Sequence, residues 1–375
     1  MAGIGDGFAS LAHAAPAAIV AEGVLEHTGN PLSEQRALAL GKAIAPLGDR
    51  TVLAVPGEDR LTWLESFSTQ RVSVLAPGES AELLILDPSG RVEHAASIVD
   101  DGATAWLIVD RTDAAGLLDF LVKMRFRLRV APRDAGDEYG VVGGTSGALQ
   151  AVHAAAPGGV PLVWHDPWPG VTVGGWAYST ADPHPGSERD WAEALIDAGE
   201  AERLARAVAS GSLRLGGVLA VEALRVAAWR PRISDADDRL LPHEADWLRS
   251  AVHLDKGCYR GQETVAKVHN LGHPPRRIVA LQLDGSDSAL PVRGDVVRDG
   301  EKEVGTIVAA VMHYEQGPIA LALVRRSTPL EVELVVDTAH GPVAAAQEVI
   351  VPPEAGSVAS VPRLPRLGRR RTAES

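Results

Sequence analysis

The last quarter of the chain constrains its fold most, because it carries strand patterns and no helical ones. From Arg276 onward, short segments rich in valine, isoleucine and leucine alternate with turn signals. Several short strands with such punctuation are typical of a small antiparallel barrel. Strands are predicted at 278–283, 304–312, 318–324, 330–336 and 342–351, with Gly294, Gly300, Gly317 and Gly341 among the turns. We therefore predict a β-barrel over residues 275–351, with a domain boundary near residue 274.

Residues 1–274 mix strand and helix patterns, which indicates an α+β body of two subdomains. Apolar residues spaced three and four apart predict helices at 59–68, 112–124, 143–156, 191–197, 201–208 and 216–229. Short apolar runs between turn signals predict strands at 43–47, 51–55, 81–86, 91–99, 103–109, 128–131, 139–142, 161–164 and 171–178. The first 30 residues show little periodicity and are expected to be irregular.

Charge and cysteine content limit the classes of function. The chain has 375 residues and a formal net charge of −13, which lacks the positive field that non-specific nucleic-acid binding needs. A single cysteine excludes an intrachain disulfide framework and a multi-cysteine metal site, and it fits a reducing compartment. No uncharged apolar run reaches membrane-spanning length, and no basic residue precedes the apolar stretch 8–24. We predict a cytoplasmic monomer with no membrane span.

The end of the chain departs from this acidic character. Residues 352–375 are rich in proline and arginine and carry no core pattern, so they are predicted to form a disordered basic tail. Such a tail could contact RNA or an acidic partner, but a solvated tail without a role is more common.

The octapeptide Lys256-Gly-Cys-Tyr-Arg-Gly-Gln-Glu263 contains the only cysteine in the chain. Lys256 and Arg260 flank Cys258, and a helix predicted from Gln262 would bring its N-terminus close to the thiol. Positive neighbours and a helix N-terminus favour the thiolate and therefore a reactive cysteine. A small buried hydrophobe under a turn is the equally weighted alternative.

No other motif in the chain points to a known chemistry. There is no GxGxxG or Walker-type phosphate loop and no GxSxG nucleophile elbow. His269 and His273 are four residues apart, but Gly272 and Pro274 make a helical metal site there a poor candidate. Nothing in the sequence requires a metal.

The octapeptide resembles the signature of the YgfZ family, folate-binding relatives of the glycine-cleavage T-protein. Segments around Met124–Val130, Leu224–Ile233, Leu241–Ala245 and Gly305–Ala310 fit the same family. The resemblance implies three subdomains in a cloverleaf around a central channel, with the barrel last. It also implies a tetrahydrofolate or a derivative bound in that channel. It implies binding residues Arg225, Lys256, Tyr259, Gln262 and Glu263, and a functional thiol at Cys258.

Two departures from the T-protein pattern bear on activity. The acidic pair of the T-protein relatives falls on His94 and Ala95, and a further glutamate is replaced by Ala227. Without a placed carboxylate, one-carbon transfer in the T-protein manner is disfavoured, and a conventional enzyme is not expected. The resemblance implies an accessory protein for the assembly or repair of iron–sulfur clusters in enzymes, including tRNA-modifying enzymes. It implies iron–sulfur enzymes and cluster-assembly proteins as partners. A folate-dependent aminomethyltransferase or demethylase acting on a small amine is the alternative.

Overall fold

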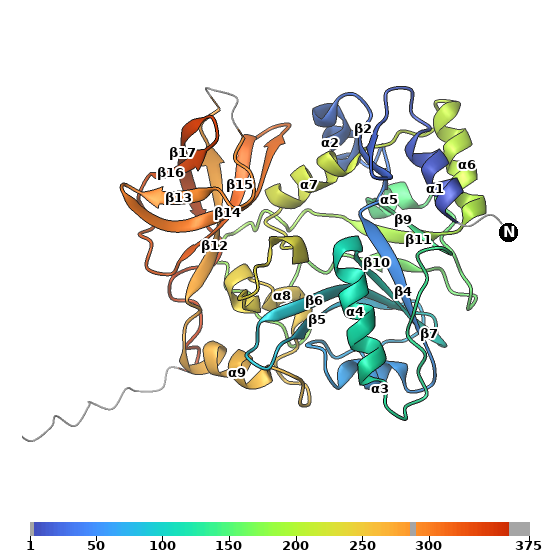
Figure 1. Cartoon of the computed structure of the whole chain (residues 1–375), viewed down its shortest axis with the longest axis horizontal. Helices are drawn as coiled ribbons and strands as arrows, with labels where there is room; N and C mark the ends of the chain where they lie inside the picture. Colours follow the sequence, from blue (N-terminus) through green and yellow to red (C-terminus); the bar gives the residue numbers. More distant parts are fainter. Residues whose placement is uncertain (1–3, 286–289, 360–375) are drawn as a thin grey trace, which may run out of the picture.

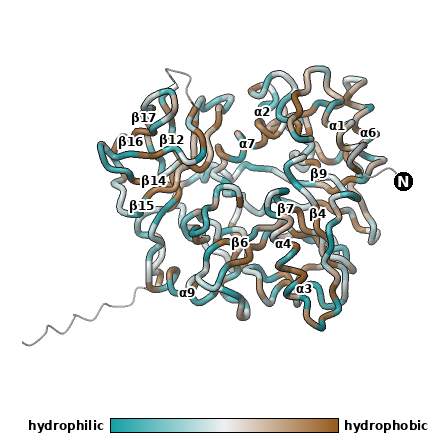
Figure 2. The backbone as a smooth tube through the Cα atoms, viewed as in Figure 1, coloured by the Kyte–Doolittle hydropathy of each residue, from teal (hydrophilic) through white to brown (hydrophobic). Residues whose placement is uncertain are grey.

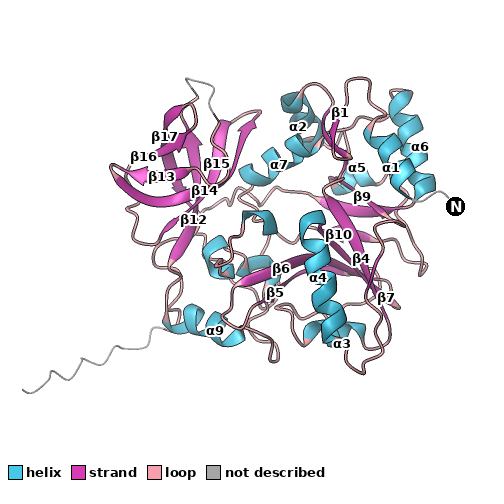
Figure 3. Cartoon of the chain, viewed as in Figure 1, coloured by secondary structure: helices cyan, strands magenta, loops and turns pink. Residues whose placement is uncertain are grey.

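The computed structural model describes residues 4–285 and 290–359, which form an α+β body beside a closed β-barrel (Figure 1). Strands occupy the centre of the body and most helices lie around them (Figure 3). The Arg-rich segment 363–371 lies outside the described residues. Within the described ranges, no helix has the length and apolar character needed to cross a bilayer.

The barrel confirms the strand-only prediction for the last quarter of the chain. Its strands close in the order β12-β15-β14-β13-β16-β17, and all neighbours are antiparallel. They are β12 (Arg276–Leu283), β13 (Val296–Asp299), β14 (Lys302–His313), β15 (Gly317–Arg325), β16 (Leu334–Thr338) and β17 (Gly341–Val349). The short strand β13 was not predicted, because its residues alternate between valine and charge over only four positions.

The strand β15 is apolar on both faces because it separates two cores. Ala320, Ala322 and Val324 point into the barrel with alternate residues of β12. The intervening residues Ile319, Leu321 and Leu323 pack against the body instead. Burial on both faces explains why this strand reads as a continuous apolar run.

The body contains two sheets packed against each other. One sheet has the order β5-β6-β7-β4-β8 and the other has the order β10-β11-β9-β3. The first comprises β4 (Arg50–Pro56), β5 (Ser80–Leu86), β6 (Val92–Asp100), β7 (Thr104–Asp110) and β8 (Arg133–Asp134). The second comprises β3 (Ala45–Pro46), β9 (Gly140–Gly144), β10 (Val163–His165) and β11 (Ala192–Ile196). A core that includes Trp106, Trp164 and Trp191 fills the space between them.

Helices cover the outer faces of both sheets. In the first sheet, α3 (Arg60–Glu65) and α4 (Arg111–Met124) bury Trp63, Leu117 and Leu121. The hydrophobic stretches along β4, β7 and α4 are visible in Figure 2. In the second sheet, α1 (Ile4–Ala12) and α6 (Ala198–Ala209) pack on β9 and β11. The remaining elements are β1 (Ile19–Ala21), β2 (Val24–His27), α2 (Pro31–Ala39), α5 (Ser146–Leu149), α7 (Val218–Ala227), the 3-10 turns η1 (Ile233–Asp235) and η2 (Pro242–Ala245), α8 (Leu248–Ala251) and α9 (Gln262–Leu271).

Several element predictions in the body were wrong. The predicted helix 191–197 is the strand β11, whose five residues are all buried between two cores. A short apolar run that is buried on both sides carries no period that separates strand from helix. The start of the chain, which was predicted to be irregular, forms the helix α1. Of the predicted helix 143–156, only the single turn α5 is helical.

Two predicted strands are absent from the described part of the chain. Residues 128–131 form no ladder, and residues 171–178 form a loop. Gly174 in this loop has a positive φ of 75°, and a side chain there would meet the His253 ring. The backbone of residues 171–178 therefore turns at Gly174 and does not form the extended strand that their apolar residues predicted.

The helix α9 starts at Gln262, within the octapeptide, and packs tightly on the β5–β6 turn. Gly261 precedes the helix with a φ of 82°, which favours glycine. A Cβ atom on Gly261 would lie 2.6 Å from the Asp87 carbonyl oxygen and 3.0 Å from the Gly90 Cα. The predicted disordered tail begins with residues that lie along α9, because Val358 and Ala359 donate backbone hydrogen bonds to its last carbonyls.

We predict that Gly261→Ala destabilises the protein by about 1–3 kcal/mol, because the new methyl group combines a strained φ with a backbone clash. Gly257→Ala is the matched control in the same loop, since a Cβ there has no atom within 4 Å. Urea denaturation of both variants measures the difference. Equal midpoints for the two variants would contradict the proposed contact.

Candidate functional site

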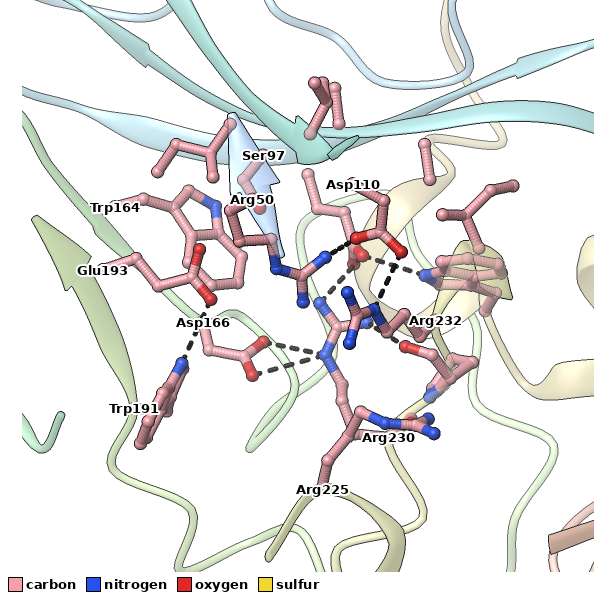
Figure 4. Close-up of a pocket in the computed structure, with 18 of the residues that line it drawn as sticks. Arg50, Ser97, Asp110, Trp164, Asp166, Trp191, Glu193, Arg225, Arg230 and Arg232 are labelled. Carbon is pink, nitrogen blue, oxygen red and sulfur yellow. Dashed lines mark hydrogen bonds and ion pairs between the residues drawn. The ribbon is translucent and has the colours of Figure 1, made fainter. Parts of the chain in front are cut away.

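A central cavity lies between the two sheets of the body and the segment that follows α7 (Figure 4). Its volume is about 70 Å³, which is room for a few water molecules. Arginines and carboxylates dominate its lining, which includes Arg50, Glu82, Asp110, Asp166, Arg189, Glu193, Arg225, Arg230 and Arg232. Ala95, one of the two positions on which the acidic pair of the T-protein relatives falls, faces the same space.

Arg225, predicted to bind folate, is buried in an internal ion-pair set. Its guanidinium donates to Glu222 and Asp235, with Nη1 to Asp235 Oδ2 at 2.7 Å, and to the Arg230 carbonyl at 2.5 Å. Burial lowers the pKa of Arg225, but Asp235 and Glu222 raise it further, and the net shift is upward. Its nitrogens are thus engaged by protein groups.

Arg230 joins three distant parts of the body. Its Nη2 donates to Glu82 on β5 at 2.8 Å, and its Nε donates to Asp166 at 3.1 Å. Glu82 also accepts from the Trp247 indole at 2.9 Å and from the Ser250 hydroxyl at 2.7 Å. All three hydrogen bonds that Glu82 accepts therefore come from groups of the fold itself.

The remaining carboxylates of the central cavity are also occupied. Asp110 pairs with Arg50 and Arg232, Asp166 pairs with Arg189 and Arg230, and Glu193 accepts from the Trp191 indole. Small-molecule sites usually span about 300–1,000 Å³. With about 70 Å³ and no free carboxylate in its lining, the central cavity as built has no room for a pterin.

The octapeptide lines a second and larger cavity, the signature cavity, of about 660 Å³. It lies between α9, the Gly174–Trp176 loop and the octapeptide itself. Its lining consists of Gly174, Gly175, Trp176, Leu254, Asp255, Lys256, Tyr259, Gln262, Glu263, Val265, Ala266, His269 and Asn270. The structure thus brings together four of the five predicted binding residues and places the fifth, Arg225, at the central cavity.

Lys256 is held by backbone carbonyls. Its Nζ donates to the carbonyl oxygens of Glu65 at 2.6 Å, Ser68 at 2.5 Å and Gln70 at 3.1 Å. Burial lowers the pKa of Lys256 to about 8, with Glu65 opposing the shift, so the ammonium form predominates at neutral pH. All three donors of the ammonium are used, so Lys256 fixes the loop after α3 to the octapeptide.

Aromatic and amide groups form the ligand-facing part of the signature cavity. The Tyr259 ring lies 5.1 Å from Lys256 Nζ, and the Tyr259 backbone N–H donates to Gln262 Oε1 at 3.0 Å. Trp176 is 40% exposed and contacts the His269 ring edge-on. The Glu263 carboxylate has no hydrogen-bonded or ion-paired partner in the described ranges.

A buried polar pair stands behind this cavity. The Tyr178 hydroxyl lies 2.8 Å from His269 Nδ1, and burial lowers the pKa of His269. Sequence reasoning missed Trp176, Tyr178 and His269. Trp176 and Tyr178 were assigned to a strand, and His269 was weighed only as a partner of His273.

Cys258 is exposed on the octapeptide, one residue before Tyr259. The buried-hydrophobe alternative is therefore wrong. The cations expected to favour its thiolate have other partners: Lys256 binds carbonyls, and Arg260 pairs with Glu93 on β6 at 2.6 Å. In residues 4–285 and 290–359, no group of three or more histidine, cysteine, aspartate or glutamate side chains is arranged to hold a metal ion.

The overall architecture is that of the glycine-cleavage T-protein. The aminomethyltransferase T of the Bartonella henselae glycine cleavage system matches with a TM-score of 0.66 and 16% identity, over 90% of this chain and 91% of that chain. The predicted α+β fold with T-protein-like organisation and a terminal barrel is therefore confirmed. Residues 276–353 also match the family model of the CAF17 C-terminal beta-barrel domain.

The more specific likeness is to iron–sulfur assembly proteins. A mitochondrial iron-sulfur cluster assembly factor IBA57 homolog of Cryptococcus neoformans is 26% identical over 64% of this chain and 66% of its own length. A putative chloroplastic transferase of Arabidopsis thaliana is 24% identical over 77% of this chain and 66% of its length. The chain thus spans slightly less than two thirds of these curated relatives. The chain is thus similar to CAF17 and IBA57 proteins. Its resemblance to the YgfZ family in particular stays a prediction.

We predict that Lys256→Met destabilises the protein by about 1–3 kcal/mol, because the apolar stem remains but three buried carbonyl groups lose their donor. Lys267→Met, on the exposed side of α9, is the control and should change the unfolding free energy little. Chemical denaturation gives both values. A Lys256→Met variant as stable as the control would show that the carbonyl contacts contribute nothing.

Proposed function

We propose that this protein is an accessory factor for the assembly or repair of iron–sulfur clusters that binds tetrahydrofolate or a derivative in the signature cavity. One observation carries the proposal: a single loop lines a ligand-sized cavity with Tyr259 and exposes the only thiol of the chain at Cys258. The relatives named as cluster assembly factors support the cluster part of the proposal. The T-protein fold supports the folate part.

The chemistry of the signature cavity fits the pterin end of a folate. Trp176 and Tyr259 offer aromatic faces, and the Glu263 carboxylate and Gln262 amide offer hydrogen bonds to the ring edge. Lys256 orients the octapeptide and does not bind the glutamate tail, because its ammonium is already saturated. The tail then extends toward solvent.

Cys258 acts in this proposal as a transient contact to sulfur or to a cluster. Iron–sulfur clusters generally take four protein ligands, and the chain has one cysteine. Partner proteins therefore supply the other ligands, and the proposed clients include tRNA-modifying enzymes. We retain the predictions of a folate-binding body over 1–274, a monomer and a cytoplasmic location.

The transferase alternative has weaker support. The T-protein pattern has its acidic pair where this chain has His94 and Ala95, so no carboxylate stands at that position. The free Glu263 carboxylate of the signature cavity lies outside that pattern and is assigned to the pterin edge. The carboxylates that do line the central cavity are engaged by arginine or by indole. We therefore do not propose one-carbon transfer.

Titration with tetrahydrofolate, followed by tryptophan fluorescence, should give saturable binding, because Trp176 lies in the signature cavity. Glu263→Gln should weaken binding about tenfold by removing one charged hydrogen bond. The exposed Glu188→Gln is the control and should bind as the wild type does. Unsaturable wild-type titration, or equal affinity in all three proteins, would reject the folate site.

Cys258→Ala should lower the activity of cluster-dependent enzymes in cells that lack the wild-type chain, while tetrahydrofolate affinity stays unchanged. Gly257→Ala alters the same loop without touching the thiol and should support full activity. If Cys258→Ala also supports full activity, the thiol has no part in cluster assembly, whatever the folate result.

A further inference from the structure

A third cavity, the seam groove, opens between the body and the barrel. Its volume is about 720 Å³, within the usual range for small-molecule sites. The β5–β6 turn, the loop before η2, the start of α9 and the strands β14 and β15 all contribute to it. The lining is Ser89, Arg91, Asp237, Arg239, Leu241, Thr264, Pro275, Arg276, Glu303, Val304, Gly305, Thr306, Leu323 and Arg325.

The charge of this lining is opposite to that of the whole chain. Four arginines face two carboxylates, although the chain carries a net charge of −13. Asp237 is neutralised by Arg276, whose Nη2 donates to it at 3.0 Å. Glu303 is the remaining carboxylate in the lining and is exposed. Arg276 is itself shared between Asp237 and Glu244, so the positive charge that remains for a ligand is that of Arg91, Arg239 and Arg325. These three side chains line one concave space, where positive charge attracts anions most strongly.

Arg276 is a fixed wall of the groove. Its Nε and Nη2 donate to the buried Glu244 at 3.0 and 2.8 Å, in addition to the pair with Asp237. Burial lowers the pKa of Arg276, and Glu244 and Asp237 raise it by more. Because its guanidinium is bound to two carboxylates, Arg276 is fixed in position and is not available to a ligand. Any ligand of the groove would bind the other arginines.

Those other arginines are free to bind. In the part of the chain that the structure describes, the guanidinium groups of Arg91 and Arg325 have no hydrogen-bonded or ion-paired partner. Arg239 Nε lies 3.9 Å from Asp238 Oδ1, and both side chains are exposed, so this ion pair contributes little to stability. Two unpaired guanidinium groups and the weakly paired Arg239, from three separate segments around one groove, form a receptor for oxyanions.

The rest of the lining indicates the body of the ligand. Leu241, Val304 and Leu323 provide an apolar floor, and the hydroxyls of Ser89, Thr264 and Thr306 lie among the arginines. We propose that the seam groove binds a small organic anion with two acidic groups, phosphate or carboxylate, which meet Arg91, Arg239 and Arg325. Phosphate and carboxylate share the chemistry that these arginines recognise, and the two ligand sources are separated by experiment.

Isothermal titration calorimetry of the full chain at low salt, with inorganic pyrophosphate and with glutarate as probes, tests the site. At least one probe should bind with one-to-one stoichiometry, and the one that binds identifies the anionic group. The double variant Arg91→Gln/Arg325→Gln should weaken that binding by at least about tenfold for each charged hydrogen bond lost. Both side chains lack protein partners, so the variant should unfold at the wild-type temperature.

Arg326→Gln is the matched control for the Arg325 change, because it removes one positive charge at the next residue and its guanidinium is directed to the Pro353 carbonyl. It should bind the probe with wild-type affinity. Equal loss in Arg326→Gln would indicate a general effect of surface charge and overturn the proposal. Absence of saturable binding of both probes to the wild-type chain would also overturn it.

Discussion

The organisation of the body depends on its buried arginine–carboxylate pairs. Arg230 connects the strand β5 through Glu82 to the loop of Asp166, and Arg225 closes the segment after α7 through Asp235. Removing one partner of such a pair leaves an uncompensated buried charge, which costs about 3–5 kcal/mol. The pairs therefore fix how the two sheets and the segment between them meet. They also fill the centre of a fold whose relatives suggested a ligand there.

Because these pairs fill the centre of the body, a ligand-sized cavity has to lie at its periphery, as the signature cavity does. The octapeptide is held at two points: Lys256 donates to the loop after α3, and Arg260 pairs with Glu93. Between these contacts the loop presents Cys258 to solvent and Tyr259 to the signature cavity. The charged residues around the thiol thus serve first to shape the loop. The exposure of the cysteine follows from that shape.

Sequence patterns predicted the parts of this structure that depend on local periodicity. Five of the six barrel strands and the helix α9 were predicted, because apolar runs between turn signals and helical spacing are visible over a few residues. The strand β11 was missed because burial on both faces removes any period. The role of Lys256 was missed for a different reason: its partners are backbone carbonyls near residue 68, and carbonyls exist at every position. Arg225 was predicted to bind a ligand although Glu222, three residues earlier on α7, is a helical i,i+3 partner that the sequence shows. Its second partner, Asp235, lies beyond the helix and gives no sign of pairing in the sequence.

The helix α9 borders two cavities at once. Thr264 faces the seam groove, while Gln262, Glu263 and Val265 face the signature cavity. Gly261 packs directly against Gly90, so the start of this helix is in close backbone contact with the β5–β6 turn that carries Arg91. Any displacement of α9 therefore changes the shape of both cavities together. Thermodynamic reciprocity then requires that two occupants coupled through this helix alter each other's affinity by the same factor.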